Sequence, residues 1–287
     1  MGSGSWNSVK FAAYTASTKM GASIDSTGAI TSTLSNQEIF KSKSIDPALN
    51  PHNVIRECCD SEEHPNTKPI ILALDVTGSM GNAAVEVAKK LNVIMTKLYK
   101  EIPDIEFMIM GIGDLAYDRA PIQASQFESD IRIAEQLDKV WFEFGGGGNS
   151  YESYSAAWYF GLNNTRLDCW NRGEKGIIIT IGDEMINPYL PHDELSVSLG
   201  NYPQSDVNTY ELYKDVINKF DIYHLDVNHR SRYDEQEIYY SWEEILGDHF
   251  IKSTMNSISD DIINVILNSS KNKPINSPVN SNGGISW

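Results

Sequence analysis

An apolar run that ends in an acidic residue is the feature that most constrains the fold of this chain. Residues 69–74 read Pro-Ile-Ile-Leu-Ala-Leu, the pattern of a strand buried on both faces, and Asp75 follows immediately. Residues 82–101 have apolar residues spaced three and four apart, which predicts an amphipathic helix that ends before Pro103. A buried strand followed directly by such a helix is typical of a parallel α/β sheet.

The same alternation of strand and helix patterns continues to residue 269. Strands are predicted over residues 105–112, 176–181 and 221–227, with short ones near Ile122 and Phe250. Helices are predicted over residues 127–140, 150–162, 210–220, 237–246 and 258–268. The fold class that follows is α/β, with a doubly wound, mostly parallel central sheet and helices on both faces.

The flanking segments lack this alternation. Residues 1–67 are rich in Ser, Thr, Ala and Asn and are expected to form an irregular N-terminal extension, in which residues 52–63 are considered for a helix. Residues 68–269 form the predicted domain. Residues 270–287 are dominated by Asn, Ser, Pro and Gly, a composition expected to give a flexible tail.

Charge and cysteine content exclude several classes of partner. The net charge of −16 over 287 residues disfavours nucleic acid and anionic membrane surfaces, since both require clustered Lys and Arg. No apolar run approaches the ~20 residues of a membrane helix, and no secretion signal is visible at the start. Three cysteines, Cys58, Cys59 and Cys169, form no disulfide framework, which predicts a cytoplasmic protein, and adjacent cysteines lack the spacing of zinc ligands.

The end of the first strand has the composition of a metal loop. Asp75, Thr77 and Ser79 alternate with small residues immediately before a helix, so their oxygens are expected on one side of the turn. Hard oxygen ligands suit Mg²⁺, with Mn²⁺ and Ca²⁺ as alternatives. Because ligands of parallel sheets bind beyond the carboxyl ends of the strands, Asp114 and Asp183 at other predicted strand ends fall at the same edge.

This loop resembles the metal-ion-dependent adhesion site of von Willebrand factor type A (vWA) domains, whose first loop reads Asp-x-Ser-x-Ser. Thr77 replaces the middle Ser and keeps the hydroxyl. Residues 145–152 (GGGGNSYE) resemble a family branch with a Gly-Gly-Gly-Asp-x-Pro-Glu second loop, with Asn149 at the Asp position. The resemblance covers residues 69–268, and it implies that the metal is held by five residues: Asp75, Thr77, Ser79, Asn149 and Asp183.

Other residues near these loops admit two interpretations. Ser150 and Glu152 are either ligands or lie behind the ligands, and Glu152 also suits the cap of the following helix. Asp114 is expected to support the site rather than to bind the metal. The loop from Asp75 to Ser79 also has the composition of a plain helix cap.

The resemblance implies a non-enzymatic module that binds a protein partner through a metal-bridged Asp or Glu. The first alternative is a metal-dependent hydrolase that uses the same loop, and the second is a structural or assembly component, such as a phage-encoded one. Enzyme motifs are weak: the sequence around Ser79 lacks the first glycine of a nucleophile elbow, because Thr77 stands two residues before it, and no phosphate-binding Gly-Lys-Thr/Ser loop occurs.

Overall fold

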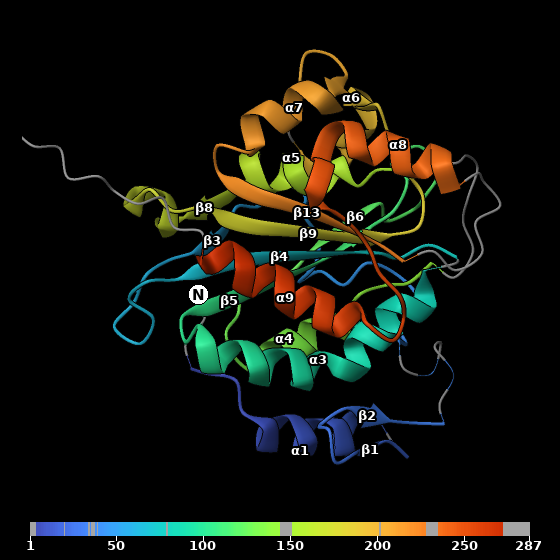
Figure 1. The fold of residues 1–287 in the computed structure, drawn as a ribbon. Helices are drawn as coiled ribbons and strands as arrows, with labels where there is room; N and C mark the ends of the chain where they lie inside the picture. The colour runs from blue at the N-terminus through green and yellow to red at the C-terminus, as the bar shows by residue number, and fades with distance from the viewer. Residues whose placement is uncertain are drawn as a thin grey trace, which may run out of the picture.

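The computed structural model describes residues 4–19, 21–33, 35, 38, 40–78, 80–143, 151–200, 202–227 and 235–271. Figure 1 shows a mixed α/β arrangement in which a central sheet lies between two layers of helices. No helix in this described part of the chain is both long and apolar enough to cross a membrane.

A six-stranded sheet, in the order β14-β13-β9-β4-β5-β6, forms the centre of the described structure. Its strands are β4 (Lys68–Asp75), β5 (Ile105–Ile112), β6 (Ile122–Ala124), β9 (Gly176–Gly182), β13 (Phe220–Asp226) and β14 (Phe250–Lys252). Only the β5–β6 pair in this sheet is antiparallel. The predicted α/β class with a mostly parallel sheet is therefore confirmed.

The register of the sheet brings the ends of four parallel strands to one edge. Asp75 at the end of β4 lies opposite Ile112 at the end of β5. Gly182 at the end of β9 lies opposite Asp226 at the end of β13. Because these strands are parallel, the loops that follow them leave the sheet together, which is where α/β sheets bind their ligands.

Helices cover both faces of this sheet (Figure 1). The described α-helices are α1 (Ser8–Thr18), α3 (Gly81–Glu101), α4 (Arg132–Leu137), α5 (Ser155–Asn163), α6 (His192–Leu199), α7 (Thr209–Val216), α8 (Glu235–Leu246) and α9 (Ile258–Lys271). Side chains of α3 and α9 belong to one apolar core, and side chains of α5, α7 and α8 belong to a second. Burial on both sides explains why β4 and β5 consist almost entirely of apolar residues.

Smaller elements connect these layers. The described part of the chain contains the 3-10 helices η1 (Asp168–Arg172) and η2 (Gly247–His249). The short strands are β1 (Ser23–Ile24), β2 (Ile30–Thr31), β3 (Arg56–Cys58), β7 (Tyr151–Glu152), β8 (Thr165–Leu167), β10 (Met185–Ile186), β11 (Tyr189–Leu190) and β12 (Val207–Asn208). They pair in twos outside the central sheet, and the parallel pair β7–β10 joins the region after the glycine-rich loop to the region after β9.

Three of the predicted helices differ most from the structure, and the helix predicted over 210–220 ends at Val216. A helix over 52–63 is wrong, because residues 56–58 form β3 and pair with β8. The helix over 127–140 is shortened to α4, since Glu128 forms a bridge with Phe107 of β5 instead. The helix over 150–162 begins only at Ser155, after β7.

The N-terminal segment contains the regular helix α1, which the sequence did not predict. Asn7 caps it by accepting hydrogen bonds from the backbone N–H groups of Val9 and Lys10. Phe11 is buried in the core that α3 and α9 share. The division of the chain near residue 67 stays a prediction, although apolar residues from both sides of it meet in this core.

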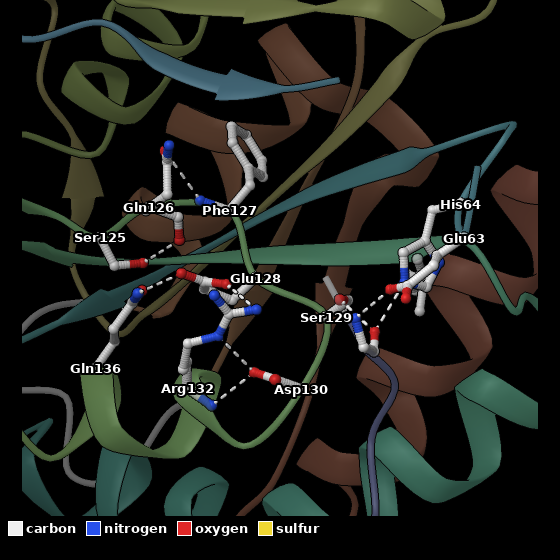
Figure 2. A network of polar contacts seen from close by, with 12 residues as sticks. Glu63, His64, Ser125, Gln126, Phe127, Glu128, Ser129, Asp130, Arg132 and Gln136 are labelled. Atoms are coloured by element: carbon white, nitrogen blue, oxygen red, sulfur yellow. Dashed lines mark hydrogen bonds and ion pairs between the residues drawn. The ribbon is translucent and has the colours of Figure 1, made fainter. Parts of the chain in front are cut away.

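Polar contacts hold the start of the described chain against the start of the sheet (Figure 2). The Gly4 carbonyl accepts hydrogen bonds from His64 Nε2 (2.8 Å) and Ser129 Oγ (2.7 Å), and its N–H donates to Glu63 Oε2 (2.8 Å). In the same network Arg132 bridges the carboxylates of Glu128 and Asp130.

Glu106 of β5 lies close enough to His64 and Glu128 of this network for their charges to act on its pKa, and it is only 1% exposed. Neither of its carboxyl oxygens has a hydrogen-bond partner within the described residues. Burial raises its pKa from 4.5 to about 7; nearby Cys58 and His64 lower the pKa, and the Glu128 carboxylate raises it. A buried carboxyl group with so little compensation favours its neutral form.

This burial predicts a pH-dependent stability. Because the pKa is raised in the folded protein, Glu106 contributes fully to the free energy of unfolding below pH 4.5. This stabilising contribution is lost as the pH rises through about 7. The free energy of unfolding of Glu106→Gln, relative to that of the wild type, should therefore rise by up to about 3 kcal/mol between pH 4 and pH 8. Urea unfolding at both pH values measures this difference, with exposed Glu101→Gln as the control. If the variant and the wild type differ in free energy of unfolding by the same amount at both pH values, the raised pKa of Glu106 is contradicted.

Candidate functional site

The loop after β4 is organised by the side chain of Asp75. This residue is 1% exposed, and its Oδ1 accepts hydrogen bonds from the N–H (2.9 Å) and the hydroxyl (2.7 Å) of Thr77. Its Oδ2 accepts a hydrogen bond from the Tyr154 hydroxyl at 2.9 Å. Asp75 is thus not the cap of α3, whose preceding residue is Met80 and has no side-chain cap hydrogen bond.

Glu152 from the second loop meets this group. It lies in β7, is 5% exposed, and its Oε1 accepts a hydrogen bond from the Thr77 hydroxyl at 3.3 Å. Its Oε2 is buried without a hydrogen-bond partner among the residues that the structure describes. The capping role considered for Glu152 is wrong, because α5 begins three residues later and its cap position is Tyr154.

The loop after β9, here called the third loop, carries two more carboxylates close to Asp75, those of Asp183 and Glu184. Asp183 follows the end of β9, and its charge acts on the pKa values of Asp75 and of Glu184. Burial raises the pKa of Glu184 to about 7, and the charges of Asp183 and Asp75 add to that effect. At the end of β13, burial and then Asp183 raise the pKa of Asp226 to about 6.

Asp114 shapes the turn after β5. Its Oδ1 accepts a hydrogen bond from the Ala116 N–H at 2.8 Å, and its own N–H donates to Asp118 Oδ2 at 2.6 Å. The next N–H, of Leu115, donates to Ser153 Oγ at 3.0 Å and so connects this turn to the second loop. These contacts make Asp114 part of the turn itself, and its expected role in supporting the metal site stays a prediction.

Three of the predicted ligands lie outside the described residues: Ser79, Asn149 and Ser150. The structure brings Asp75, Thr77 and Glu152 into direct contact and places Asp183 close enough to act on the charge of Asp75. As a set of metal ligands, the predicted residues stay a prediction.

The electrostatics of this edge fit a divalent cation. Burial raises the pKa values of Asp75 and Glu152, and the carboxylates repel one another, Asp183 acting on Asp75 and Asp75 on Glu152. Buried charge of one sign is costly unless an opposite charge compensates it. Carboxylate and hydroxyl oxygens are also the donors that Mg²⁺ prefers.

Carboxylates alone do not complete such a site. Within the described ranges, no group of three or more His, Cys, Asp or Glu side chains is arranged to hold a metal ion. A cation at this edge would therefore draw on hydroxyl oxygens such as that of Thr77 as well as on carboxylates. The same finding gives no support to zinc at His52, Cys58, Cys59 and His64.

Four residues at this edge were not predicted as part of the site: Tyr154, Glu184, Asp118 and Asp226. Asp226 ends β13, whereas the sequence pattern extended that strand to residue 227. Glu184 directly follows Asp183 and carries the signal of any acidic residue after a strand. Tyr154 follows Glu152 by two residues, and nothing in the sequence marks its hydroxyl as a partner of Asp75.

Comparison with known proteins gives only distant likenesses. No family model and no curated protein matches the chain. Among solved structures, the open conformation of the pilus adhesin SpaC from Lactobacillus rhamnosus GG has a TM-score of 0.48 and 12% identity, over 77% of this chain and 31% of that one. The vWF domain of the type V pili tip protein Mfa5 from Porphyromonas gingivalis has a TM-score of 0.48 and 10% identity, over 73% of this chain and 98% of that one. This chain thus spans about a third of the length of SpaC.

Proposed function

We propose that this chain is a doubly wound, vWA-type module that holds a divalent cation and uses it to bind a carboxylate of a partner protein. The observation that carries the proposal is the contact between the first two loops. The Thr77 hydroxyl oxygen lies 2.7 Å from Asp75 Oδ1 and 3.3 Å from Glu152 Oε1, and Glu152 Oε2 lies buried beside them without a partner in the described structure. A cation would neutralise the charge that gathers there.

Asp75, Thr77 and Asp183 are the residues that would hold the cation, together with Ser79 and Asn149 of the predicted set. Glu152 joins them or accepts from Thr77 behind the ligands, with Ser150 as a further candidate. Mg²⁺ takes about six oxygens and commonly keeps waters where protein ligands are missing, so a partner carboxylate can replace a water. We place the module in the cytoplasm and expect no nucleic-acid or membrane partner.

A binding function is favoured over catalysis by the surroundings of Asp75. His224, which packs against the Tyr154 ring, is fully buried, and its Nδ1 lies 2.8 Å from the Thr180 hydroxyl. Burial holds the pKa of His224 well below its usual range. A histidine in that position does not reach a substrate and is a poor proton acceptor near neutral pH.

Chelation tests the binding function. The wild-type protein, immobilised in Mg²⁺, should retain its partner from a cell extract, lose it in EDTA and recover it when Mg²⁺ returns. Salt should weaken the complex less than EDTA does, because a short metal–carboxylate contact is screened little. Circular dichroism on the same samples gives the folded fraction, and full retention by folded protein in EDTA would defeat the proposal. A phosphoester hydrolysis assay with Mg²⁺ and Mn²⁺ separates it from the hydrolase alternative.

A further inference from the structure

Tyr154 is a fully buried residue at the start of α5, directly beneath the loops that carry Asp75 and Asp183. Its ring centroid lies 5.0 Å from that of His224 and 5.4 Å from that of Trp242. The ring is therefore enclosed by β13 and α8, and only its hydroxyl extends toward the carboxylates.

That hydroxyl connects two loops. It donates to Asp75 Oδ2 at 2.9 Å and lies 3.4 Å from the Glu184 N–H, which donates to it. The first contact fixes the loop after β4, and the second fixes the loop after β9. Since a hydroxyl offers one proton and two lone pairs, it can serve both contacts at once.

The approach of Tyr154 to the sheet depends on Gly182. A Cβ atom at position 182 would lie 1.9 Å from the Tyr154 hydroxyl oxygen and 2.3 Å from Cζ of the ring. No side chain fits in that space, so the glycine at the end of β9 is what allows the hydroxyl to reach Asp75. The requirement is for space, since the φ angle of Gly182 is not positive.

His224 and Trp242 form an aromatic layer that packs against the Tyr154 ring and contacts the loop after β9. The His224 ring stacks on Trp242 with 3.7 Å between centroids. The Trp242 indole donates to the Glu184 carbonyl at 3.1 Å, so both backbone polar groups of Glu184 are bound by buried aromatic residues. This aromatic layer keeps the third loop at a fixed place relative to Asp75.

We propose that Tyr154 is a positioning residue of the cation site, whose hydroxyl sets the orientation of Asp75 and joins the loop after β4 to the loop after β9. The inference rests on the proposed cation binding. Outer residues that orient metal ligands commonly change affinity 10–100-fold when they are altered. Without the hydroxyl, Asp75 Oδ2 loses its hydrogen bond, and the carboxylate is oriented through Oδ1 by Thr77 alone.

Tyr154→Phe tests this role because it keeps the ring and removes only the hydroxyl. Calorimetric titration with Mn²⁺ well below the melting temperature should show an affinity about tenfold weaker than that of the wild type. The electron paramagnetic resonance spectrum of bound Mn²⁺ should also broaden, since the ligand geometry is less uniform. A Tyr154→Phe protein with wild-type Mn²⁺ affinity and spectrum would overturn the inference, even if its melting temperature falls.

The matched control is Tyr213→Phe in α7. Tyr213 packs against Trp158 in the same apolar core, with 5.7 Å between centroids, but belongs to none of the three loops. This variant should bind Mn²⁺ as the wild type does. If it weakens binding equally, the loss in Tyr154→Phe comes from general softening of the core, and the inference fails. A wild-type protein that binds no Mn²⁺ overturns both the inference and the proposed function, whereas normal wild-type binding with an unchanged Tyr154→Phe overturns the inference alone.

Discussion

Replacing Asp75 with alanine is expected to abolish binding of Mg²⁺ and Mn²⁺, with a loss of affinity of at least ~100-fold. Asp75 accepts three hydrogen bonds, from Thr77 and Tyr154, and is the residue on which the first loop is built. Removing the Asp75 side chain takes away one anionic ligand and also the hydrogen-bond acceptor that orients the Thr77 hydroxyl. Calorimetric titration of the two proteins with Mn²⁺ measures the effect.

The fold should survive this substitution, because Asp75 lies at the end of β4 and not within the apolar layers. Burial raises the pKa of its carboxyl group, so its charge is a cost to the metal-free fold rather than a support. Asp221→Ala is the control, since this carboxylate lies at the opposite end of the sheet and contacts Lys175 and Ser269. Unchanged Mn²⁺ affinity in Asp75→Ala, or an equal loss in Asp221→Ala, would remove Asp75 from the site.

Saturating Mg²⁺ is expected to raise the melting temperature of the wild type by roughly 5–10 °C. A ligand present at 100 times its Kd stabilises the folded state by about 2.7 kcal/mol, and about 1 kcal/mol shifts the melting temperature of a domain this size by about 2–4 °C. The physical source of the effect is the neutralisation of carboxylates that repel one another at the strand ends. Differential scanning fluorimetry with and without EDTA measures it.

The stabilisation should decrease at lower pH. Burial and neighbouring charges raise the pKa of Glu184 to about 7 and that of Asp226 to about 6, so protons compete with the cation as the pH falls below 7. The Mg²⁺-induced shift should be smaller at pH 5.5 than at pH 8. Asp75→Ala should show no shift at either pH. An equal shift in the wild type and in Asp75→Ala would indicate a cation bound elsewhere.

The sequence predicted the elements whose patterns are long and strongly apolar. The strand over 105–112 has the predicted bounds, and the helix over 82–101 begins one residue earlier, at Gly81. Such segments are predictable because burial on both faces, or on one helical face, leaves a direct pattern in the residue order. The helix α6 was not predicted, because its residues 192–199 alternate acidic, apolar and Ser residues without a clear apolar face.

The secondary-structure predictions for the N-terminal region were wrong for a different reason. Residues 56–58 form a strand only because β8 lies beside them, and that pairing joins segments more than a hundred residues apart. The local sequence does not contain this information. The same holds for α1, whose helix is stabilised by burying Phe11 and by hydrogen bonds and charge pairing of Tyr14 and Lys19 with Asp138.

The candidate site was predictable to the extent that its residues follow strands. Asp75 and Asp183 were found because parallel strands end at a common edge. The contact between Thr77 and Glu152 and the hydrogen bond from Tyr154 to Asp75 could not be predicted, because both depend on how β7 and α5 approach the sheet. Side chains that act through packing have no fixed spacing in the sequence.

Water-proton relaxation of Mn²⁺ bound to the wild type is the sharpest test of a cation site in this protein, since it reports both the bound cation and its exchangeable waters. We expect the protein to enhance the water-proton relaxation rate of a Mn²⁺ solution, and acetate or a Glu-containing peptide then to lower that rate by displacing water. Chloride at the same ionic strength should leave the enhancement unchanged, and Asp75→Ala should show none. No enhancement with the wild type, or an enhancement that carboxylates do not reduce, would contradict a cation site open to a partner carboxylate.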